Sequence, residues 1–343
     1  MTSPAGPLTG LLREPAVTDV LVNGPREVWT DRGHGLIRES LTFTSDDEVR
    51  RLAVRLASAA GRRLDAGSPF VDARLEGGVR LHAALPPVAV SGVHLSLRIH
   101  RASGLDLARL VAGGSLHPAF DEVLAALVAA RLAFVISGGA GTGKTTLLGA
   151  LLARADPGER ILVVEDTAEL TVSHPHVVRL QARPPNVEGA GEITLRELVR
   201  QALRMRPDRV IVGEVRGAEL LDMLVAANTG HDGALTTLHA NGVADVPARV
   251  EALAMLAGLP RAAAHSLLAS ALGVAVHLER GTDGCRRVAE IAVLQRGAGD
   301  LVRAITAVRW AGGSADVVPG PGAPLLRALL RRNGAVPAVL GPP

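Results

Sequence analysis

The most constraining feature of the sequence is the octapeptide GGAGTGKT at residues 138–145, which fits the pattern G-x-x-x-x-G-K-[ST]. The apolar segment LAFVIS precedes it and KTTLLGALLARA follows it, so we expect the glycines to connect a buried strand to a helix. Glycines let backbone N–H groups close around an anion, and the first turn of the helix directs its positive end at the same point. The pattern therefore predicts a phosphate-binding loop.

Lys144 is the only lysine in the sequence, and the other strongly basic residues are arginines. This ratio suggests a G+C-rich genome, in which a lysine persists where arginine does not serve. A compact ammonium fits against the β- and γ-phosphates better than the wider guanidinium. We therefore expect Lys144 to bind the phosphates of ATP and Thr145 to bind Mg²⁺ through its hydroxyl group. The expected nucleotide contacts are Gly138, Gly139, Ala140, Gly141, Thr142, Gly143, Lys144, Thr145 and Thr146.

Four further strand-like segments follow the loop and are interspersed with helical patterns: ILVVED, VVRLQ, DRVIVGE and GALTTLH. Continuous apolar strands that alternate with helices indicate a parallel sheet covered on both faces, and hence an α/β fold. Before the loop, short strands surround one helix, which Ser45 and Glu48 begin with a capping-box pattern. The predicted organisation is an α+β domain at 1–102, a linker with a short helix at 103–118, an α/β domain at 119–310 and a tail at 311–343. We expect the tail to be a surface appendage with one short basic helix.

Acidic residues follow two of the predicted strands. Glu214 ends DRVIVGE, at the edge where open α/β sheets bind ligands, so we expect it to contact Mg²⁺, directly or through water, and to polarise the attacking water. Glu165, Asp166 and Glu169 lie at the end of ILVVE and just after it, and either Glu165 or Asp166 could position water. An exposed strand end or a solvated turn is the ordinary alternative for such residues.

Two histidines lie near another strand end. His239 ends GALTTLH, and His231 lies in the glycine-flanked turn before that strand. A histidine is commonly a satisfied core or surface group, but a strand end beside the phosphate loop favours a catalytic role for both residues.

Several arginines are candidates by their position in the sequence. Arg216 lies two residues after Glu214, and Arg204 and Arg206 precede the same strand. Two more arginines, Arg98 and Arg101, close the first domain and could reach a phosphate from there. Ordinary surface charge is the alternative for each of them.

Composition limits the remaining possibilities. The single cysteine, Cys285, excludes a disulfide framework and a four-thiolate zinc site. The N-terminus has no signal-peptide pattern, and Arg131 interrupts the longest apolar segment, so we expect a cytoplasmic protein. The formal charge is only +3, and the pI of 10.1 reflects this near balance rather than a nucleic-acid surface.

Together, the blocks GGAGTGKTT, ILVVEDTAEL, RVIVGEVRG and TGHDGALTTLHAN resemble those of the secretion ATPase superfamily, which drives type II secretion, type IV pili and type IV secretion. RLQARPPNVEG and LRMRPDRVIVGEVRGAELLDMLVAANTGHDG are most similar to the tight-adherence (Flp) pilus branch, the CpaF or TadA-like ATPases. VTDVLVNG, GRRLDAGSPFVDARL and LSLRIHR also match in the first domain. The resemblance covers residues 15–295.

The resemblance implies a RecA-like P-loop NTPase domain, preceded by a smaller mobile domain, that forms a hexameric ring beneath an inner-membrane platform. It gives Lys144 and Thr145 the Walker A roles and Glu214 the Walker B role. The other family positions correspond to Glu165, Asp166 and Glu169 in the acidic box, His231 and His239 in the histidine box, and Arg98 and Arg101 among the arginines that reach nucleotide. The tetracysteine motif of some relatives does not occur in this sequence, so no zinc is expected.

The predicted function is that of an ATP-hydrolysing motor for pilus assembly or protein secretion. A nucleic-acid motor, such as a conjugative DNA-transfer ATPase, shares the loop and the ring. The aromatic content of 2% disfavours it, because single-strand channels commonly use aromatic stacking platforms. A small-molecule kinase fits poorly, since no second substrate site is evident.

Overall fold

The computed structural model describes residues 4–33, 35–99, 106–185, 189–228, 233–281, 284–311, 316–331 and 336–341. The chain forms two compact units, residues 1–102 with 187–190, and residues 103–186 with 191–343. None of the helices within these described ranges is long and apolar enough to cross a membrane.

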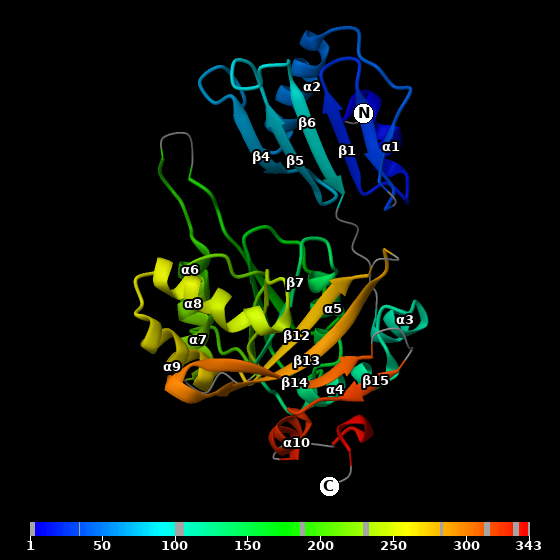
Figure 1. The fold of residues 1–343 in the computed structure, drawn as a ribbon. Coiled ribbons are helices and arrows are strands. Elements are labelled where there is room, and N and C mark those ends of the chain that lie inside the picture. The colour runs from blue at the N-terminus through cyan, green and yellow to red at the C-terminus, as the bar shows by residue number, and fades with distance from the viewer. Residues whose placement is uncertain are drawn as a thin grey trace. The chain divides into compact units, whose positions relative to one another are not determined.

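The first unit is an antiparallel sheet with one long helix packed on it (Figure 1). Its six strands lie in the order β3-β2-β1-β6-β5-β4. The elements are η1 (Gly6–Leu8), α1 (Thr9–Arg13), β1 (Asp19–Asn23), β2 (Val28–Asp31), β3 (Leu36–Arg38), α2 (Asp46–Ala59), β4 (Phe70–Arg74), β5 (Val79–Ala84) and β6 (His94–Ile99). Alternate strand residues such as Leu81, Leu95 and Leu97 are buried together with Leu52 and Leu56 of α2. Period-two burial on one face is what the alternating sequence pattern predicts.

The predicted capping box at α2 forms with one change. The Ser45 side chain accepts from the Glu48 N–H, as expected, but the Glu48 carboxylate accepts from the backbone and hydroxyl of Thr44 rather than from the Ser45 N–H. A complete capping box occurs at the start of α6 (Leu195–Ala202), between Thr194 and Glu197. Both motifs satisfy amide groups that the first helical turn would otherwise leave unpaired.

The second unit is built on a nine-stranded sheet in the order β15-β14-β13-β12-β7-β11-β10-β8-β9. Every neighbouring pair from β12 to β9 is parallel, and β13, β14 and β15 add to β12 in antiparallel fashion. The strands are β7 (Phe134–Gly138), β8 (Ile161–Glu165), β9 (Val177–Gln181), β10 (Arg209–Val212), β11 (Leu235–Leu238), β12 (Val274–Arg280), β13 (Arg286–Arg296), β14 (Val302–Trp310) and β15 (Val317–Pro319). The parallel core is as the sequence predicts.

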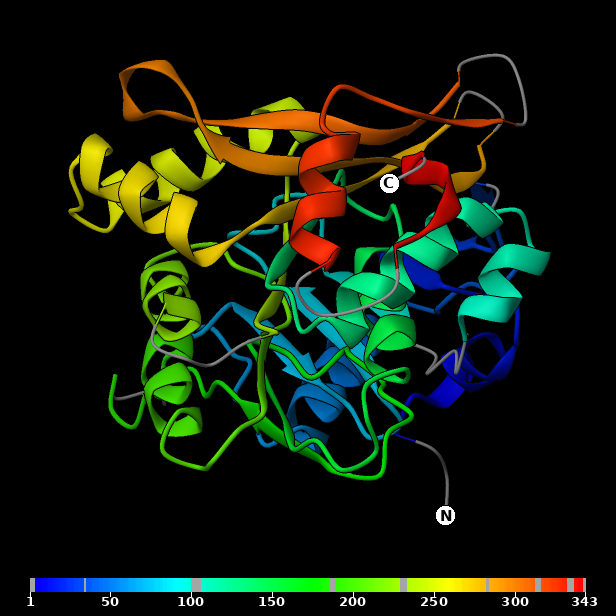
Figure 2. The ribbon, with the colours of Figure 1, turned by 90° about the horizontal axis from the view of Figure 1, so that it is seen from below.

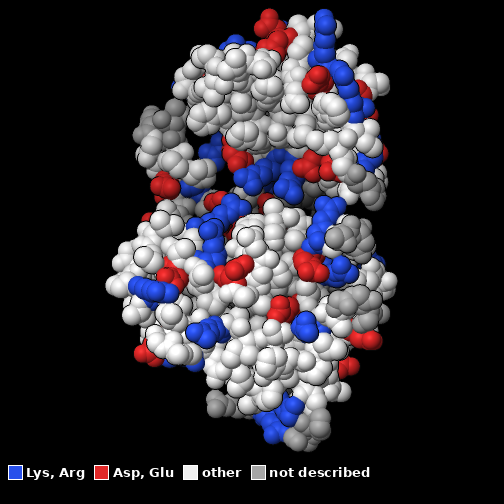
Figure 3. All heavy atoms as spheres, in the orientation of Figure 1, with Lys and Arg blue, Asp and Glu red and all other residues white. Residues whose placement is uncertain are grey.

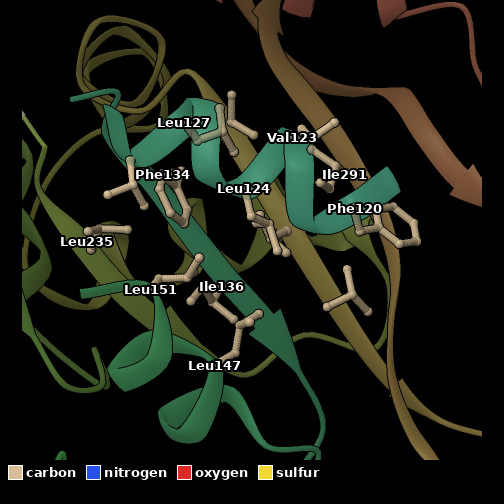
Figure 4. Packing of buried hydrophobic residues seen from close by; sticks show 14 of the residues in the cluster. Phe120, Val123, Leu124, Leu127, Phe134, Ile136, Leu147, Leu151, Leu235 and Ile291 are labelled. Atoms are coloured by element: carbon tan, nitrogen blue, oxygen red, sulfur yellow. The ribbon is translucent and has the colours of Figure 1, made fainter. Parts of the chain in front are cut away.

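Helices cover both faces of this sheet. One face carries α3 (Leu107–Ala112), α4 (Pro118–Ala129), α5 (Lys144–Leu152) and α10 (Ala323–Arg331). The other carries α6 (Leu195–Ala202), α7 (Glu219–Asn228), α8 (Val246–Leu256) and α9 (Arg261–Ala271). Figure 4 shows α4 lying across β7, with Leu127 near Phe134 and Phe120 at the opposite end of the helix; all three belong to the same buried cluster. Because β7 is buried on both faces, the segment that leads into the glycine-rich loop at residues 138–145 has a fixed position.

The tail corrects our expectation of a surface appendage. Val317–Pro319 forms β15 against β14, and α10 lies on β13 and β14 (Figure 2). Leu326 and Leu330 of α10 are fully buried in the same core as α4 and α5. The amphipathic helix predicted in the tail is present, but its apolar side chains are buried in this unit.

We expect Leu326→Ala to lower the unfolding free energy by about 2–4 kcal/mol, because the change leaves a cavity in a closed core. Arg331→Ala, at an exposed position of the same helix, should change it by less than about 0.5 kcal/mol. Urea denaturation followed by circular dichroism measures both values. Equal effects of the two substitutions would contradict the buried position of α10.

Candidate functional site: a phosphate-binding loop and its acidic and histidine neighbours

The loop between β7 and α5 has the backbone that its glycines permit. Gly138, Gly141 and Gly143 have φ angles of 153°, 69° and 95°, and Gly143 is the residue that precedes the first helical turn. A Cβ at Gly138 would lie 2.5 Å from the carbonyl oxygen of Leu278 and 2.7 Å from Thr142 Oγ1. Glycine is therefore required there both for its backbone angle and for the close approach of β12.

Lys144 lies at the start of α5 with its ammonium folded back over the loop. Its Nζ donates to the carbonyl oxygens of Gly138 at 3.0 Å and Gly139 at 2.8 Å. Burial lowers the pKa of this ammonium, and the nearby carboxylate of Glu214 works against that shift. A cation held inside a glycine loop at a helix N-terminus is suited to binding a phosphate group.

Glu214 follows β10 at the same edge of the sheet, since β10, β11 and β7 run parallel. Its Oε1 lies 2.6 Å from His239 Nε2, and its Oε2 accepts from Arg216 Nε at 2.7 Å. His239 Nδ1 lies 3.4 Å from Lys144 Nζ. Because the ammonium can only donate, Nδ1 accepts and Nε2 carries the proton directed at Glu214. His239 thus connects the loop lysine to the strand-end carboxylate.

The charge of His239 agrees with this arrangement. Burial lowers the pKa of the imidazole, the Lys144 ammonium lowers it further, and the Glu214 carboxylate opposes both. A neutral imidazole is the form that accepts from Lys144 and donates to Glu214 at the same time. The predicted candidates thus form a series of contacts that runs from Lys144 through His239 and Glu214 to Arg216.

Glu165 occupies a different position from the other acids. Its side chain is buried, and Oε1 accepts from the backbone N–H groups of Glu169 at 3.0 Å and Leu170 at 2.7 Å. Burial raises the pKa of this carboxyl, and the two backbone hydrogen bonds counteract the rise. Gly213 makes room for it, because a Cβ there would lie 2.7 Å from Glu165 Cγ. These contacts favour a bracing role for Glu165 in the turn after β8.

The turn that Glu165 braces carries the other two acidic candidates. Asp166 is exposed and Glu169 is partly buried. The segment after them packs tightly on α5, since a Cβ at Gly149 would lie 2.5 Å from the carbonyl oxygen of Thr171. The acidic turn is thereby tied to the helix that begins at Lys144.

Arg204 and Arg206 are not brought to this edge. Arg204 and Arg206 precede β10 and so lie at the amino edge of the parallel sheet, about 13 Å of strand away from Glu214, which corrects the impression given by their sequence position. Arg98 is exposed on β6 of the first unit, with Nε 3.9 Å from Asp19 Oδ1. Arg101 and His231 lie outside the described residues.

Sequence reasoning missed two polar residues next to the loop. Ser137 is the β7 residue before Gly138, and its hydroxyl lies 2.9 Å from Nδ1 of His277 on β12. Both side chains are buried. The sequence offered one indication of His277, since it is a histidine inside the apolar segment VAVHL. That segment predicts a strand, but it does not indicate that the strand lies beside β7.

The residues present fit a magnesium nucleotide. The loop supplies an ammonium and a glycine cradle for phosphates, and the Thr145 hydroxyl and Glu214 carboxylate are oxygen ligands of the kind Mg²⁺ prefers. Among the described residues, no three His, Cys, Asp or Glu side chains are grouped to hold a metal ion by themselves. Mg²⁺ bound through one or two protein oxygens and substrate phosphates matches this donor set.

The model of the family described as type II/IV secretion system protein matches residues 2–309. The chain belongs to this family and is a member of the secretion ATPase superfamily. Among curated proteins it is 56% identical over 308 residues to a putative conjugal transfer protein of Mycobacterium tuberculosis strain H37Rv, covering 88% of this chain and 87% of the relative. It is 30% identical over 305 residues to the type IV secretion system protein PtlH of Bordetella pertussis strain Tohama I, covering 80% and 89%.

Solved structures support the fold. The Legionella pneumophila ATPase DotB aligns with a TM-score of 0.58 and 22% identity, over 81% of this chain and 77% of that one. The pilus retraction motor PilT with bound ADP aligns with a TM-score of 0.58 and 18% identity, over 95% and 85%. At these identities the likeness concerns the mixed α/β architecture alone.

The contacts of Glu165 predict different effects for two substitutions. Glu165→Gln should keep the unfolding free energy at pH 7 within about 1 kcal/mol of wild type, because its amide oxygen can accept the same two N–H groups. Glu165→Ala leaves both amides without this acceptor and should cost about 1–3 kcal/mol. Urea titrations of the two variants measure the difference.

The raised pKa of Glu165 also gives a pH dependence with a defined sign. The folded state binds this proton more tightly than the unfolded state, whose carboxyl has a pKa near 4.5. The contribution of Glu165 to stability is complete below pH 4.5 and is lost as pH rises through the folded pKa. Glu165→Gln should remove that decline. If Glu165→Gln stays folded yet loses ATP hydrolysis, the bracing role is insufficient and Glu165 takes part in the chemistry.

Proposed function

We propose that this protein is an ATP-hydrolysing motor that powers pilus assembly or protein secretion. The observation that carries the proposal is the contact of Lys144, His239 and Glu214 at the carboxyl edge of a parallel sheet, in a member of the type II/IV secretion family. Lysine for phosphates and a strand-end carboxylate for water and Mg²⁺ are the two groups that phosphoryl transfer by a P-loop enzyme requires.

In this proposal the loop of residues 138–146 binds the phosphates through backbone N–H groups, and Lys144 exchanges its two carbonyl partners for phosphate oxygens. Thr145 and Glu214 would hold Mg²⁺, which would neutralise charge on the phosphates of the bound nucleotide. Glu214 orients the attacking water and accepts its proton, while the water oxygen forms the new bond to the γ-phosphorus and the bond from that phosphorus to the ADP oxygen breaks. His239 holds Glu214 at the correct distance from Lys144.

Arg216 and the acidic turn complete the proposed chemistry. Arg216 pairs with Glu214 through both Nε and a terminal nitrogen, and its side chain is 59% exposed, so it is free to exchange that carboxylate for a phosphate oxygen. Asp166 and Glu169 are placed by the turn after β8 and are candidates to position water or metal-bound water. Motion follows if these contacts differ between ATP-bound and ADP-bound states.

We propose further that the second unit is a RecA-like domain and that it works in a hexameric ring. We propose residues 1–102 as the N-terminal domain and 119–310 as the main part of the ATPase domain, to which α3 of the segment 103–118 and β15 and α10 of the segment 311–343 add. Arg98 and Arg101 would supply positive charge to the nucleotide from the N-terminal domain. The ring would act in the cytoplasm on inner-membrane platform proteins, as the resemblance to tight-adherence pilus ATPases suggests.

A second candidate is a motor for conjugative DNA transfer. The observation that favours it is the name of the 56% identical relative, a putative conjugal transfer protein, together with a 32% identical conjugal transfer protein TrbB of Rhizobium radiobacter. On the face seen in Figure 3, acidic and basic side chains of the second unit are interspersed rather than gathered in one basic stripe. An interspersed surface gives weak general attraction for a polyanion.

The test is steady-state ATP hydrolysis by wild type, Lys144→Ala and Glu214→Gln, fractionated by size. We expect both variants to lose about a hundredfold or more in kcat, because each removes a group that acts in the transition state. Chelating Mg²⁺ with EDTA should abolish turnover of the wild type. Glu122→Gln, an exposed glutamate on α4, is the matched control and should keep full activity.

The same assay separates the two candidates. Turnover that rises in a ring-sized fraction and ignores single-stranded DNA supports the secretion motor. A severalfold increase with DNA supports the conjugative motor instead. Full activity of Glu214→Gln would overturn the assignment of the carboxylate and direct the search to Asp166 and Glu169.

A further inference from the structure

A buried histidine on β12 contacts the strand that carries the phosphate loop. His277 is 6% exposed, and its Nδ1 lies 2.9 Å from the hydroxyl of Ser137, the residue immediately before Gly138. The same hydroxyl lies 3.3 Å from the carbonyl oxygen of Val276. Either neutral tautomer of His277 can keep the contact, because a serine hydroxyl both donates and accepts. A side-chain hydrogen bond thus joins β12 to β7 one residue before the loop.

The backbone of β12 contacts the loop at the next position. His277 pairs with Ser137 and Leu278 pairs with Gly138 in the parallel register. The Leu278 carbonyl is the group that would lie 2.5 Å from a Cβ at Gly138. A displacement of β12 at residues 277–278 therefore moves the first residue of the loop directly, since there is no space between them.

The sheet is irregular at this same point. The pairing of β12 with β13 shifts between His277 and Leu278, so that His277 pairs with Glu290 and Leu278 with Val288. An extra residue on one strand increases local twist and redirects side chains, and such bulges are frequent beside active sites. Here the bulge lies where the parallel core meets the antiparallel strands β13 and β14.

The surroundings of His277 keep the ring neutral. Burial lowers its pKa, and Lys144 of α5 adds to this, whereas Glu290 of β13, Glu279 of β12 and Asp245 at the end of η2 (Val243–Asp245) favour the charged form. Glu290 is itself held by the hydroxyl of Thr306 on β14, at 2.5 Å. A hydrogen bond therefore joins β14 to β13 at Glu290, the residue that pairs with His277 in the register of β12 and β13.

We propose that His277 is a positioning residue for the phosphate-binding loop. Through Ser137 it fixes the end of β7 to β12, and so sets the position of Gly138, whose carbonyl oxygen accepts from Lys144. The proposal rests on the proposed nucleotide-binding function of the loop. It assigns His277 no contact with nucleotide, and its effect is on how well the loop is formed before nucleotide binds.

The test measures the Kd for Mg-ADP by calorimetry, and KM and kcat for ATP, in Ser137→Ala, His277→Leu and His277→Asn. We expect Ser137→Ala and His277→Leu to raise the Kd for Mg-ADP and the KM for ATP about threefold to tenfold, with a smaller change in kcat. The reason is that a misplaced loop binds both nucleotides more weakly before any reaction takes place. His277→Asn should recover most of the affinity, since its amide places a polar atom near the position of Nδ1.

The double variant tests whether the two residues act through one contact. If they do, Ser137→Ala with His277→Leu raises Kd no more than the larger single effect, because the second substitution has no bond left to remove. Effects that multiply in the double variant would contradict the proposal. Should His277→Leu fail to fold, Ser137→Ala and His277→Asn carry the test, and an unchanged Kd in Ser137→Ala overturns it.

Two controls separate positioning from general stability. His265 of α9 is 3% exposed, contacts the Glu251 carboxylate and accepts a hydrogen bond from the Val302 N–H. None of these groups belongs to the loop, so His265→Leu should lower Tm and leave the Kd for Mg-ADP unchanged. Ser270→Ala on α9 is the control for Ser137→Ala. If wild type itself binds no Mg-ADP, or Lys144→Ala binds it equally well, the proposed function of the loop fails. If Lys144→Ala loses Mg-ADP binding while Ser137→Ala and His277→Leu keep the wild-type Kd, the role of His277 fails and the proposed function of the loop stands.

Discussion

The parallel register of β7 with β11 and β12 is the constraint on which the rest of the site depends. It brings Gly138, His239 and Leu278 to one edge of the sheet, because parallel strands end on the same side. β7 is buried on both faces, and the carbonyl of Leu278 leaves no room for a side chain at Gly138. The loop is therefore shaped by the strands beside it as well as by its own glycines.

The charges at this edge are already paired with one another. Lys144 donates to two loop carbonyls, His239 lies between Lys144 and Glu214, and Arg216 holds the other oxygen of Glu214. Under the proposed function, a phosphate that binds here would exchange these hydrogen bonds rather than add to them. An exchange of partners is a physical means by which nucleotide state can change the relative positions of β10, β11 and α5.

Much of the second unit could be predicted from the sequence because its strands are apolar throughout and its helices carry capping residues, as at Thr194. The tail could not, because an amphipathic helix such as α10 has the same pattern whether a core or a partner covers it. Arg204 and Arg206 were misplaced because the whole of β10 lies between them and Glu214, so that they are near it in sequence but at the opposite edge of the sheet. The sequence could not separate Glu165 from Asp166 and Glu169. Its burial and its backbone partners depend on Gly213 and on the turn after β8, which the sequence pattern does not reveal.

The sequence by itself determined the chemistry of the loop. The glycines, Lys144 and Thr145 are adjacent in the chain, and local backbone geometry is enough to give them the arrangement that suits the proposed phosphate. Only the tertiary structure decided which distant residues meet that loop. His239 and Glu214 lie 95 and 70 positions from Lys144 along the chain, and His277 lies 140 from Ser137. Their contacts follow from strand order, which the alternation of strands and helices does not specify.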